Sequence, residues 1–242
     1  MDMQVGTLRA APVEISGLGY AYGEGALRRP VLRDVALTVQ PGEIVLLTGP
    51  SGSGKTTLLT LVGALRAVQD GSCRVLGQEM AGASEAQRVA LRRRIGFIFQ
   101  QHNLLGFLTA QQNVAMAMEV DPRSTERGRL DRATAMLAAV GLGDRGASRP
   151  DQLSGGQRQR VAVARALAGD PGLILADEPT AALDRQSGGE VVRLLRDLAR
   201  RRGVPILLVT HDPRILDIAD RIVSMEDGRI VPTKQAEGAP AA

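Results

Sequence analysis

The sequence predicts an α/β fold built around a phosphate-binding loop. Residues 49–56 read Gly-Pro-Ser-Gly-Ser-Gly-Lys-Thr and match the phosphate-loop pattern at every position. Residues 43–48 before the loop have the apolar content of a buried parallel strand, and residues 57–63 after it have that of a packed helix. Two later apolar runs flank a predicted helix (residues 173–176, 204–210 and about 189–202). Strands that alternate with helices in this way are typical of a parallel α/β core.

Length and composition are those of an ordinary globular protein with a mild excess of basic residues. The chain has 242 residues, of which 44% are hydrophobic, and this is enough for one large domain with a core. The net charge of +4 and the pI near 9.9 come from arginines that are scattered among acids. Two arginine runs, residues 92–94 and 200–202, are interpreted as solvated helix surfaces. Because tyrosine and phenylalanine are rare and tryptophan is absent, little is available to stack on bases, and no nucleic-acid partner is expected.

The sequence contains no apolar run of the length that crosses a membrane. A spanning helix needs about 18 to 20 apolar residues, whereas the apolar runs here have strand length. The N-terminal residues lack the apolar core of a secretory signal and the glycine of a myristoylation site. Cys73 is the only cysteine, so it cannot form an intrachain disulfide and is expected to be buried. A cytoplasmic protein is predicted.

The N-terminal part of the chain predicts a β layer. Residues 13–22 and 31–39 alternate well enough to be strands, and residues 71–77 supply a further strand. We expect them to form an antiparallel β subdomain, preceded by a flexible segment at residues 1–12.

A helix and an apolar strand are predicted next. Residues 84–94 favour a surface helix with Ser84 as its N-cap and an acid in its first turn. Residues 95–99 form an apolar strand that ends at Gln100.

Residues 101–168 have a different composition, rich in Ala, Leu, Met, Gln and Arg. They predict an inserted α-helical subdomain, interrupted by helix-breaking sequences (residues 121–122, 141–146 and Pro150). Residues 13–231 are expected to form a single domain, and the polar residues 232–242 a disordered tail.

The phosphate loop carries the first part of the chemistry. Its glycines let backbone N–H groups converge on phosphate oxygens, and the N-terminus of the following helix adds partial positive charge. Lys55 is expected to reach the β- and γ-phosphates, and Thr56 to bind magnesium. The alternative is a chance glycine-rich turn.

Two acids follow the apolar strand at residues 173–176. Asp177 is placed to hold magnesium beside the phosphate loop, and Glu178 to orient or deprotonate the attacking water. Alternatively, the two acids cap the next helix.

Residues 153–160, Leu-Ser-Gly-Gly-Gln-Arg-Gln-Arg, resemble a second anion-binding helix start. A serine-capped helix explains Ser154 but not the glycine pair or the basic first turn. The chain thus has two loops suited to phosphate, of which only one carries a lysine. The economical explanation is a dimer in which each nucleotide lies between the phosphate loop of one copy and the second loop of the other.

These motifs together resemble those of an ATP-binding-cassette (ABC) ATPase, the nucleotide-binding subunit of transporter complexes. The phosphate loop, the Leu-Ser-Gly-Gly-Gln signature and the Leu-Ala-Asp-Glu run occur in the order and spacing of that family, and the resemblance covers residues 13–232. It implies a P-loop NTPase core of ABC type, an ATP-dependent homodimer, and ATP and Mg²⁺ as cofactors. A monomeric P-loop kinase or GTPase would leave the signature unexplained.

The resemblance also implies a role for each candidate residue. ATP is expected to be bound by Tyr22, which stacks on adenine, and by Gly49, Pro50, Ser51, Gly52, Ser53, Gly54, Lys55, Thr56 and Thr57. Magnesium is expected at Thr56, Gln100 and Asp177, and catalysis at Glu178, His211 and Lys55. The signature residues expected on the nucleotide of the opposite subunit are Leu153, Ser154, Gly155, Gly156 and Gln157. Asp184 is implied in communication across the dimer.

Each of these roles has a structural alternative. Tyr22 could be a buried strand tyrosine, Gln100 a hydrogen-bonding strand end, and His211 a structural histidine. Asp184 could cap the helix that begins near Ser187.

Within the family, the chain resembles the branch of lipoprotein-releasing ATPases and macrolide exporters. Several stretches carry this likeness (residues 22–25, 95–100, 104–105 and 210–213). Residues 23–32 and 102–108 are most similar to the DevA-type ATPases of heterocyst glycolipid exporters. Ala181 and Ala182 stand where lipoprotein-releasing relatives usually carry Gly-Asn, and the sequence contains no permease.

The likeness implies an ATPase on the cytoplasmic face of the inner membrane that powers a separate membrane permease for export or lipid transport. A tripartite glycolipid exporter adds a periplasmic adaptor and an outer-membrane channel. The permease is expected to dock on an apolar group after Gln100 (Leu104, Leu105, Phe107 and Leu108), unless these residues are the core of the helical subdomain. The alternative function is a soluble ABC-type ATPase that acts on nucleic acid.

Overall fold

The computed structural model describes residues 10–119 and 125–231. The predicted disordered tail, most of the predicted flexible N-terminus and the break at residues 121–122 lie outside the described residues. The predicted flexible segment extends too far, because Ala11 is buried and Pro12 accepts a hydrogen bond of 2.7 Å from the N–H of Leu76. Residues 11 and 12 therefore already belong to the fold.

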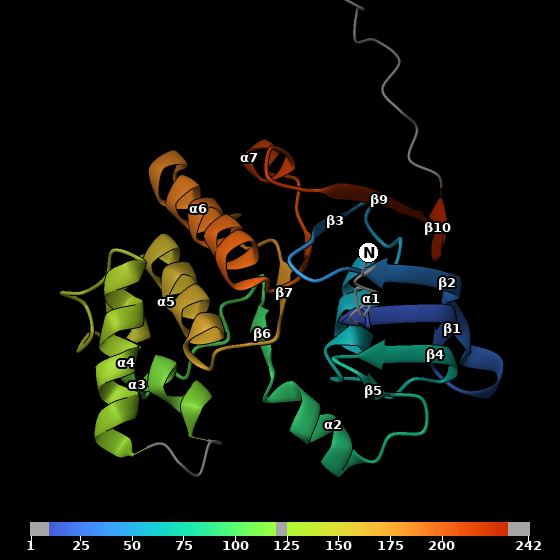
Figure 1. The fold of residues 1–242 in the computed structure, drawn as a ribbon, viewed down its shortest axis with the longest axis horizontal. Helices are drawn as coiled ribbons and strands as arrows, with labels where there is room; N and C mark the ends of the chain where they lie inside the picture. Colours follow the sequence, from blue (N-terminus) through green and yellow to red (C-terminus); the bar gives the residue numbers. More distant parts are fainter. Residues whose placement is uncertain (1–9, 120–124, 232–242) are drawn as a thin grey trace, which may run out of the picture.

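The N-terminal strands form the predicted antiparallel sheet, at the right of Figure 1. Its strand order is β2-β1-β4-β5, and it consists of β1 (Val13–Tyr22), β2 (Arg29–Val39), β4 (Asp70–Val75) and β5 (Gln78–Glu79). A short 3-10 helix, η1 (Gly25–Leu27), joins β1 to β2. β2 begins two residues before the predicted start because Arg29 and Pro30 pair with the end of β1.

The second sheet is the predicted parallel core, with one antiparallel strand at its edge. Its order is β10-β9-β3-β8-β7-β6, and its members are β3 (Ile44–Thr48), β6 (Ile95–Ile98), β7 (Leu173–Asp177), β8 (Ile206–Val209), β9 (Arg221–Glu226) and β10 (Arg229–Val231). β3, β8, β7 and β6 run parallel to one another. Their carboxyl ends therefore lie along one edge of the sheet.

Both faces of the parallel sheet are buried, and successive residues of β3 show this. Ile44 and Leu46 belong to one hydrophobic core, shared with the helical subdomain, while Val45 and Leu47 belong to the other, shared with the antiparallel sheet. Side chains alternate between the two faces of a strand, so a strand covered on both sides has to be apolar throughout. This is why residues 44–47 form a continuous apolar run.

Four helices accompany the parallel sheet: α1 (Lys55–Val62), α2 (Glu85–Arg92), α6 (Arg185–Arg202) and the short α7 (Pro213–Leu216). Ser84 caps α2 as predicted, and its hydroxyl accepts a hydrogen bond from the N–H of Gln87. α6 begins four residues before the predicted start, because Asp184 caps it by accepting from the N–H of Ser187 at 2.9 Å. The Asp184 cap was a predicted alternative and is confirmed.

The helical subdomain lies at the left of Figure 1, on the side of the parallel sheet away from the antiparallel sheet. It contains α3 (Ala110–Ala115), η2 (Met116–Met118), α4 (Glu126–Ala139), η3 (Pro150–Gln152) and α5 (Gly155–Ala168). Residues 101–109, predicted within this subdomain, are not helical, and Thr109 instead caps α3. None of the described helices is long and apolar enough to cross a membrane.

Candidate active site

Four adjacent strands deliver the candidate residues to one edge of the parallel sheet. The phosphate loop follows β3, Asp177 ends β7 and Glu178 comes directly after it. His211 follows β8, and Gln100 follows β6. Ligands of open α/β sheets bind outside the carboxyl ends of the strands, which is the edge these residues share.

The strand ends line a pocket of about 550 Å³. Most of its lining had been predicted from the sequence: Tyr22, Ser51, Gly52, Gly54, Lys55, Thr56, Thr57, Gln100, Asp177, Glu178 and His211. Val31 and Val209 also line it and had not been singled out. Gly49, Pro50 and Ser53 shape the loop itself.

The conformation of the loop depends on glycine at two points. Gly49 has φ +133°, and a Cβ there would lie 2.0 Å from the carbonyl oxygen of Met225. Gly54, the N-cap of α1, has φ +104°, and a Cβ would lie 2.7 Å from Leu32. Other residues avoid this region of φ and would clash with these neighbours.

Lys55 is folded over the loop. Its side-chain Nζ donates to the carbonyl oxygens of Gly49 at 2.7 Å and Pro50 at 2.9 Å, and the residue is only 8% exposed. The ammonium group therefore lies at the mouth of the helix N-terminus, where a phosphate is favoured.

Thr56 and Asp177 meet although they are far apart in sequence. The Thr56 hydroxyl donates to Asp177 Oδ2 at 2.9 Å, and Gln100 lines the same pocket. A hydroxyl, a carboxylate and an amide oxygen are the hard ligands that suit Mg²⁺. Among the described residues, no group of three His, Cys, Asp or Glu side chains could hold a metal on its own.

Glu178 is held in an uncommon backbone conformation, with φ +51°. Its Oε2 accepts a hydrogen bond of 3.0 Å from Thr210, and its Oε1 lies 3.8 Å from Nε2 of the exposed His211. One carboxylate oxygen is therefore fixed, while the other faces the histidine at the edge of the pocket.

Tyr22 is 38% exposed, so it is not the buried strand tyrosine of the alternative interpretation. Its hydroxyl lies 3.2 Å from Thr57 Oγ1, at the start of α1. The ring thus stands at the border of the pocket, beside the phosphate loop.

The signature residues and Asp184 do not line this pocket. Ser154 is exposed at the start of α5, where its hydroxyl accepts from the N–H of Gln157 and its own N–H donates to the Gln157 side chain. Leu153 is buried, and its carbonyl accepts a hydrogen bond of 2.6 Å from Arg158. The serine cap considered from the sequence is present, and Ser154 itself is exposed.

Sequence reasoning missed two buried polar residues next to the site. Thr210, which is 3% exposed, orients Glu178, and Gln159, which is 1% exposed, donates to the carbonyl of Pro179 at 3.0 Å. Each lies close to a recognised motif residue: Thr210 directly precedes His211, and Gln159 is two residues after Gln157. For Thr210 the available signal was its place at the end of the apolar run at residues 206–209, whereas Gln159 lies between two arginines and carried no such signal.

A protein-family model described as ABC transporter matches residues 32–181, which is more than half of the chain. The chain belongs to the ABC transporter family. Its ABC ATPase domain binds and hydrolyses ATP.

Two relatives place this ABC domain in one branch of the family. The lipoprotein-releasing system ATP-binding protein LolD of Anaeromyxobacter dehalogenans is 48% identical over 220 residues, which are 90% of this chain and 92% of LolD. The macrolide export ATP-binding/permease protein MacB of Syntrophobacter fumaroxidans is 45% identical over 229 residues, which are 93% of this chain and 32% of MacB. The chain thus spans about a third of the length of the MacB relatives. It is an ABC ATP-binding domain of the LolD and MacB branch.

Solved structures agree with the ABC fold. The ATP-binding cassette MJ0796, in a dimeric post-hydrolysis state bound to ADP and Pi, has a TM-score of 0.87 and 35% identity, and the match covers 94% of this chain and all of that one. A second dimeric structure of MJ0796, described as a bacterial ABC transporter cassette, has a TM-score of 0.86 and 37% identity, with 90% and 96% covered.

Proposed function

We propose that this ABC ATPase powers a membrane permease in an export or lipid-transport complex, from the cytoplasmic face of the inner membrane. The observation that carries the proposal is the similarity, over at least 90% of the chain, to proteins named for lipoprotein release and macrolide export. Within this class we favour a tripartite glycolipid exporter with a periplasmic adaptor and an outer-membrane channel. The DevA-like residues 23–32 and 102–108, together with Ala181 and Ala182, support this choice over lipoprotein release.

In the proposed reaction, the ATP phosphates lie along the phosphate loop and Tyr22 stacks on adenine. Lys55 and His211 stabilise negative charge on the γ-phosphate, and Glu178 orients the attacking water. The exposure of His211 and its position 3.8 Å from Glu178 support a role at the pocket edge rather than a structural one.

Mg²⁺ is proposed to be held by Thr56, Asp177 and Gln100, which all line the pocket. When bound, the ion supplies positive charge to the phosphates. The chain's part is to present the hydroxyl and the carboxylate, which already meet at 2.9 Å.

We further propose that ATP joins two copies, with Leu153 to Gln157 of one copy on the nucleotide of the other and Asp184 near the dimer interface. The exposed serine at the start of α5 and the dimeric state of MJ0796 support this arrangement. The glycine-rich start of α5 suits the approach of a phosphate, because the backbone N–H groups at a helix N-terminus favour an anion.

The dimer is tested by light scattering during size-exclusion chromatography of a Glu178→Gln variant, with and without ATP and magnesium. We expect a monomer that becomes a dimer only with both, because ATP bound without hydrolysis holds the halves together. A variant that binds ATP and stays monomeric would contradict the composite site.

A mixing experiment assigns the two loops to different copies. Lys55→Ala and Ser154→Arg proteins should each be inactive, yet their mixture should regain ATPase activity. Mixed dimers contain one site with an intact phosphate loop and an intact signature. A mixture as inactive as its components would refute the arrangement in trans.

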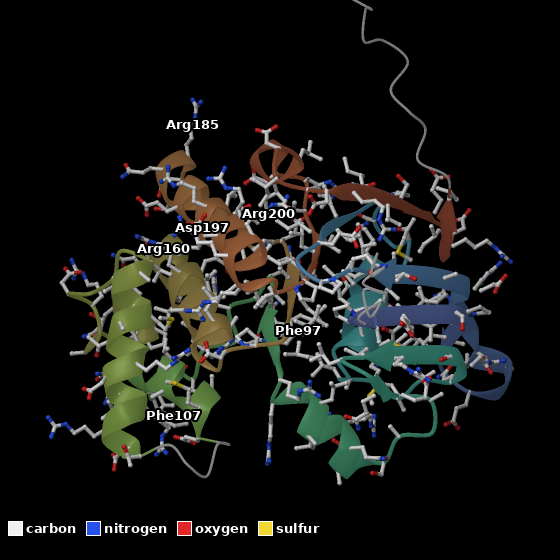
Figure 2. The ribbon with its side chains drawn as sticks, in the orientation of Figure 1. Phe97, Phe107, Arg160, Arg185, Asp197 and Arg200 are labelled. Carbon is white, nitrogen blue, oxygen red and sulfur yellow. The ribbon has the colours of Figure 1, made fainter. Side chains whose placement is uncertain are left out.

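The proposed permease docking site contains fewer exposed apolar residues than the sequence predicted. Leu104 packs against the core of the helical subdomain, as the alternative interpretation had it, whereas Leu105 is 36% and Phe107 72% exposed. Figure 2 places Phe107 at the edge of the helical subdomain. Exposed apolar side chains of this size are suited to a protein partner.

Docking is tested with the double variant Leu105→Arg/Phe107→Asp in the native membrane complex. We expect ATP binding to remain and the coupling of ATP hydrolysis to the permease to be lost. Leu27→Asp is the matched control, because Leu27 is 79% exposed on η1 in the β subdomain. Unchanged coupling in the double variant would refute the docking site.

A further inference from the structure

The Tyr22 ring is held by the segment that connects α1 to β4. We propose that Arg66 and Gln69 of this segment are positioning residues that pre-orient Tyr22 for the adenine base of ATP. The inference rests on the proposed adenine-stacking role of Tyr22 and adds residues to which no motif had assigned a function.

Arg66 bridges two tyrosine rings. Its guanidinium carbon lies 4.8 Å from the centroid of the Tyr22 ring and 5.9 Å from that of Tyr20, and Nη1 lies 3.3 Å from the Tyr20 hydroxyl, to which it donates. The rings themselves meet edge to face, with centroids 5.1 Å apart and an interplanar angle of 81°. Cation–π and edge-to-face contacts both favour these orientations, so they hold the Tyr22 ring in place.

Gln69 holds the backbone between the two tyrosines. Its side-chain Oε1 accepts from the N–H of Ala21 at 2.8 Å, and its Nε2 donates to the Ala21 carbonyl at 3.0 Å. The pairing of β1 with β4 ends at Gly19 and Asp70, so the amide of Gln69 takes the place of a strand partner at Ala21. Because Gln69 binds both the N–H and the carbonyl of Ala21, it also fixes the position of the adjacent Tyr22 Cα.

Tyr22 contacts both the pocket and Arg66. Tyr22 lines the pocket at the phosphate loop, whereas Arg66, which is half-buried, is not among the residues that line it. The guanidinium thus contacts the ring without lining the pocket. The contact of the Tyr22 hydroxyl with Thr57, at 3.2 Å, adds a third restraint.

A ring held in this way loses less freedom when a base stacks on it. Immobilising an exposed, mobile side chain on binding weakens affinity by about two- to tenfold. Arg66 and Gln69 remove this cost before ATP arrives. The benefit depends on the base, because the phosphates do not touch Tyr22 in the proposed binding mode.

The test is calorimetric binding of two probes, ATP and inorganic tripolyphosphate, each with magnesium, to the full chain carrying Glu178→Gln. Arg66→Met removes the guanidinium and keeps an apolar stem. We expect it to weaken ATP binding about two- to tenfold and to leave tripolyphosphate binding unchanged. Arg66→Lys should recover part of the lost ATP affinity. Gln69→Ala, like Arg66→Met, should weaken ATP binding and leave tripolyphosphate binding unchanged.

Tyr22→Ala supplies the reference. It should weaken ATP binding selectively, and adding Arg66→Met to it should cause no further loss, because Arg66 acts through the ring. If Tyr22→Ala is selective and Arg66→Met is not, or if Arg66→Met weakens both probes equally, the positioning role is overturned while the proposed site stands. If Tyr22→Ala leaves ATP affinity unchanged, the adenine-stacking role fails and the inference fails with it.

Discussion

Replacing Thr210 with valine tests whether the carboxylate of Glu178 has to be oriented for ATP hydrolysis. Thr210 is 3% exposed, and its hydroxyl makes two hydrogen bonds. It donates to Glu178 Oε2 at 3.0 Å and accepts from the N–H of Asp212 at 3.1 Å. Valine has nearly the same shape as threonine and removes only the hydroxyl.

The size of the effect follows from the two bonds. A hydrogen bond to a charged group contributes about 1.5–3 kcal/mol, which corresponds to about 10- to 100-fold in rate if the orientation is needed in the transition state. We therefore expect kcat of Thr210→Val to fall about 10- to 100-fold, with little change in ATP affinity. The loss of the Thr210 hydroxyl as acceptor for the N–H of Asp212 should also lower the free energy of unfolding by about 1–3 kcal/mol.

The assay is steady-state phosphate release, with kcat and KM measured separately, together with equilibrium binding of ATP. Thr210→Ser is the matched control, because it keeps the hydroxyl and should retain most of the activity. Urea unfolding of each variant separates the loss of stability from the loss of rate. A folded Thr210→Val protein with a kcat within about twofold of the wild type would refute the orienting role, because the expected loss is larger.

Three side chains outside the pocket give further predictions. The fully buried amide of Asn113 makes four hydrogen bonds to the backbone of residues 105–109, so Asn113→Ala should lower the free energy of unfolding in urea by about 2–4 kcal/mol, and a loss below about 1 kcal/mol would contradict this. The hydrogen bond from Arg200 holds the pKa of Asp220 below its usual value. The ionised Asp220 carboxylate therefore stabilises the fold above its unfolded pKa of about 3.9, and this stability is lost as the pH falls through the folded pKa. The stability difference between the wild type and Asp220→Asn should accordingly shrink from about pH 6 to about pH 2, and a constant difference would contradict the pairing. Burial raises the pKa of Cys73 to about 12, so a thiol reagent at about pH 8 should label only unfolded protein; rapid labelling of native protein would contradict the burial.

The candidate site could be predicted largely because its residues lie within short motifs or at strand ends. The loop at residues 49–56 carries its conformation in its own glycines, and Asp177 and Glu178 directly follow an apolar run. Once the strands are parallel, their carboxyl ends share an edge, so local patterns are enough to bring distant residues together. The pocket lining follows from this geometry.

Contacts between side chains from different segments could not be predicted in the same way. Arg66 and Gln69 lie in a stretch of unremarkable sequence, and only the path of the chain from α1 to β4 brings them to Tyr22. Helix starts were less certain for a related reason. Asp184 was considered as a cap, yet its effect on the start of α6 depended on a hydrogen bond that the periodicity of apolar residues does not encode.

The buried contacts around α5 show how this helix is tied to the segment that follows β7. Gln159, on α5, donates to the carbonyl of Pro179, the residue that follows Glu178. Thr180, the next residue, donates to Asp212 beside His211 at 2.6 Å. Because Gln159 is 1% exposed, water cannot replace its bond to Pro179. A displacement of α5 therefore has to break this bond at a cost or carry Pro179 with it, and in the second case the backbone next to Glu178 moves with the signature helix.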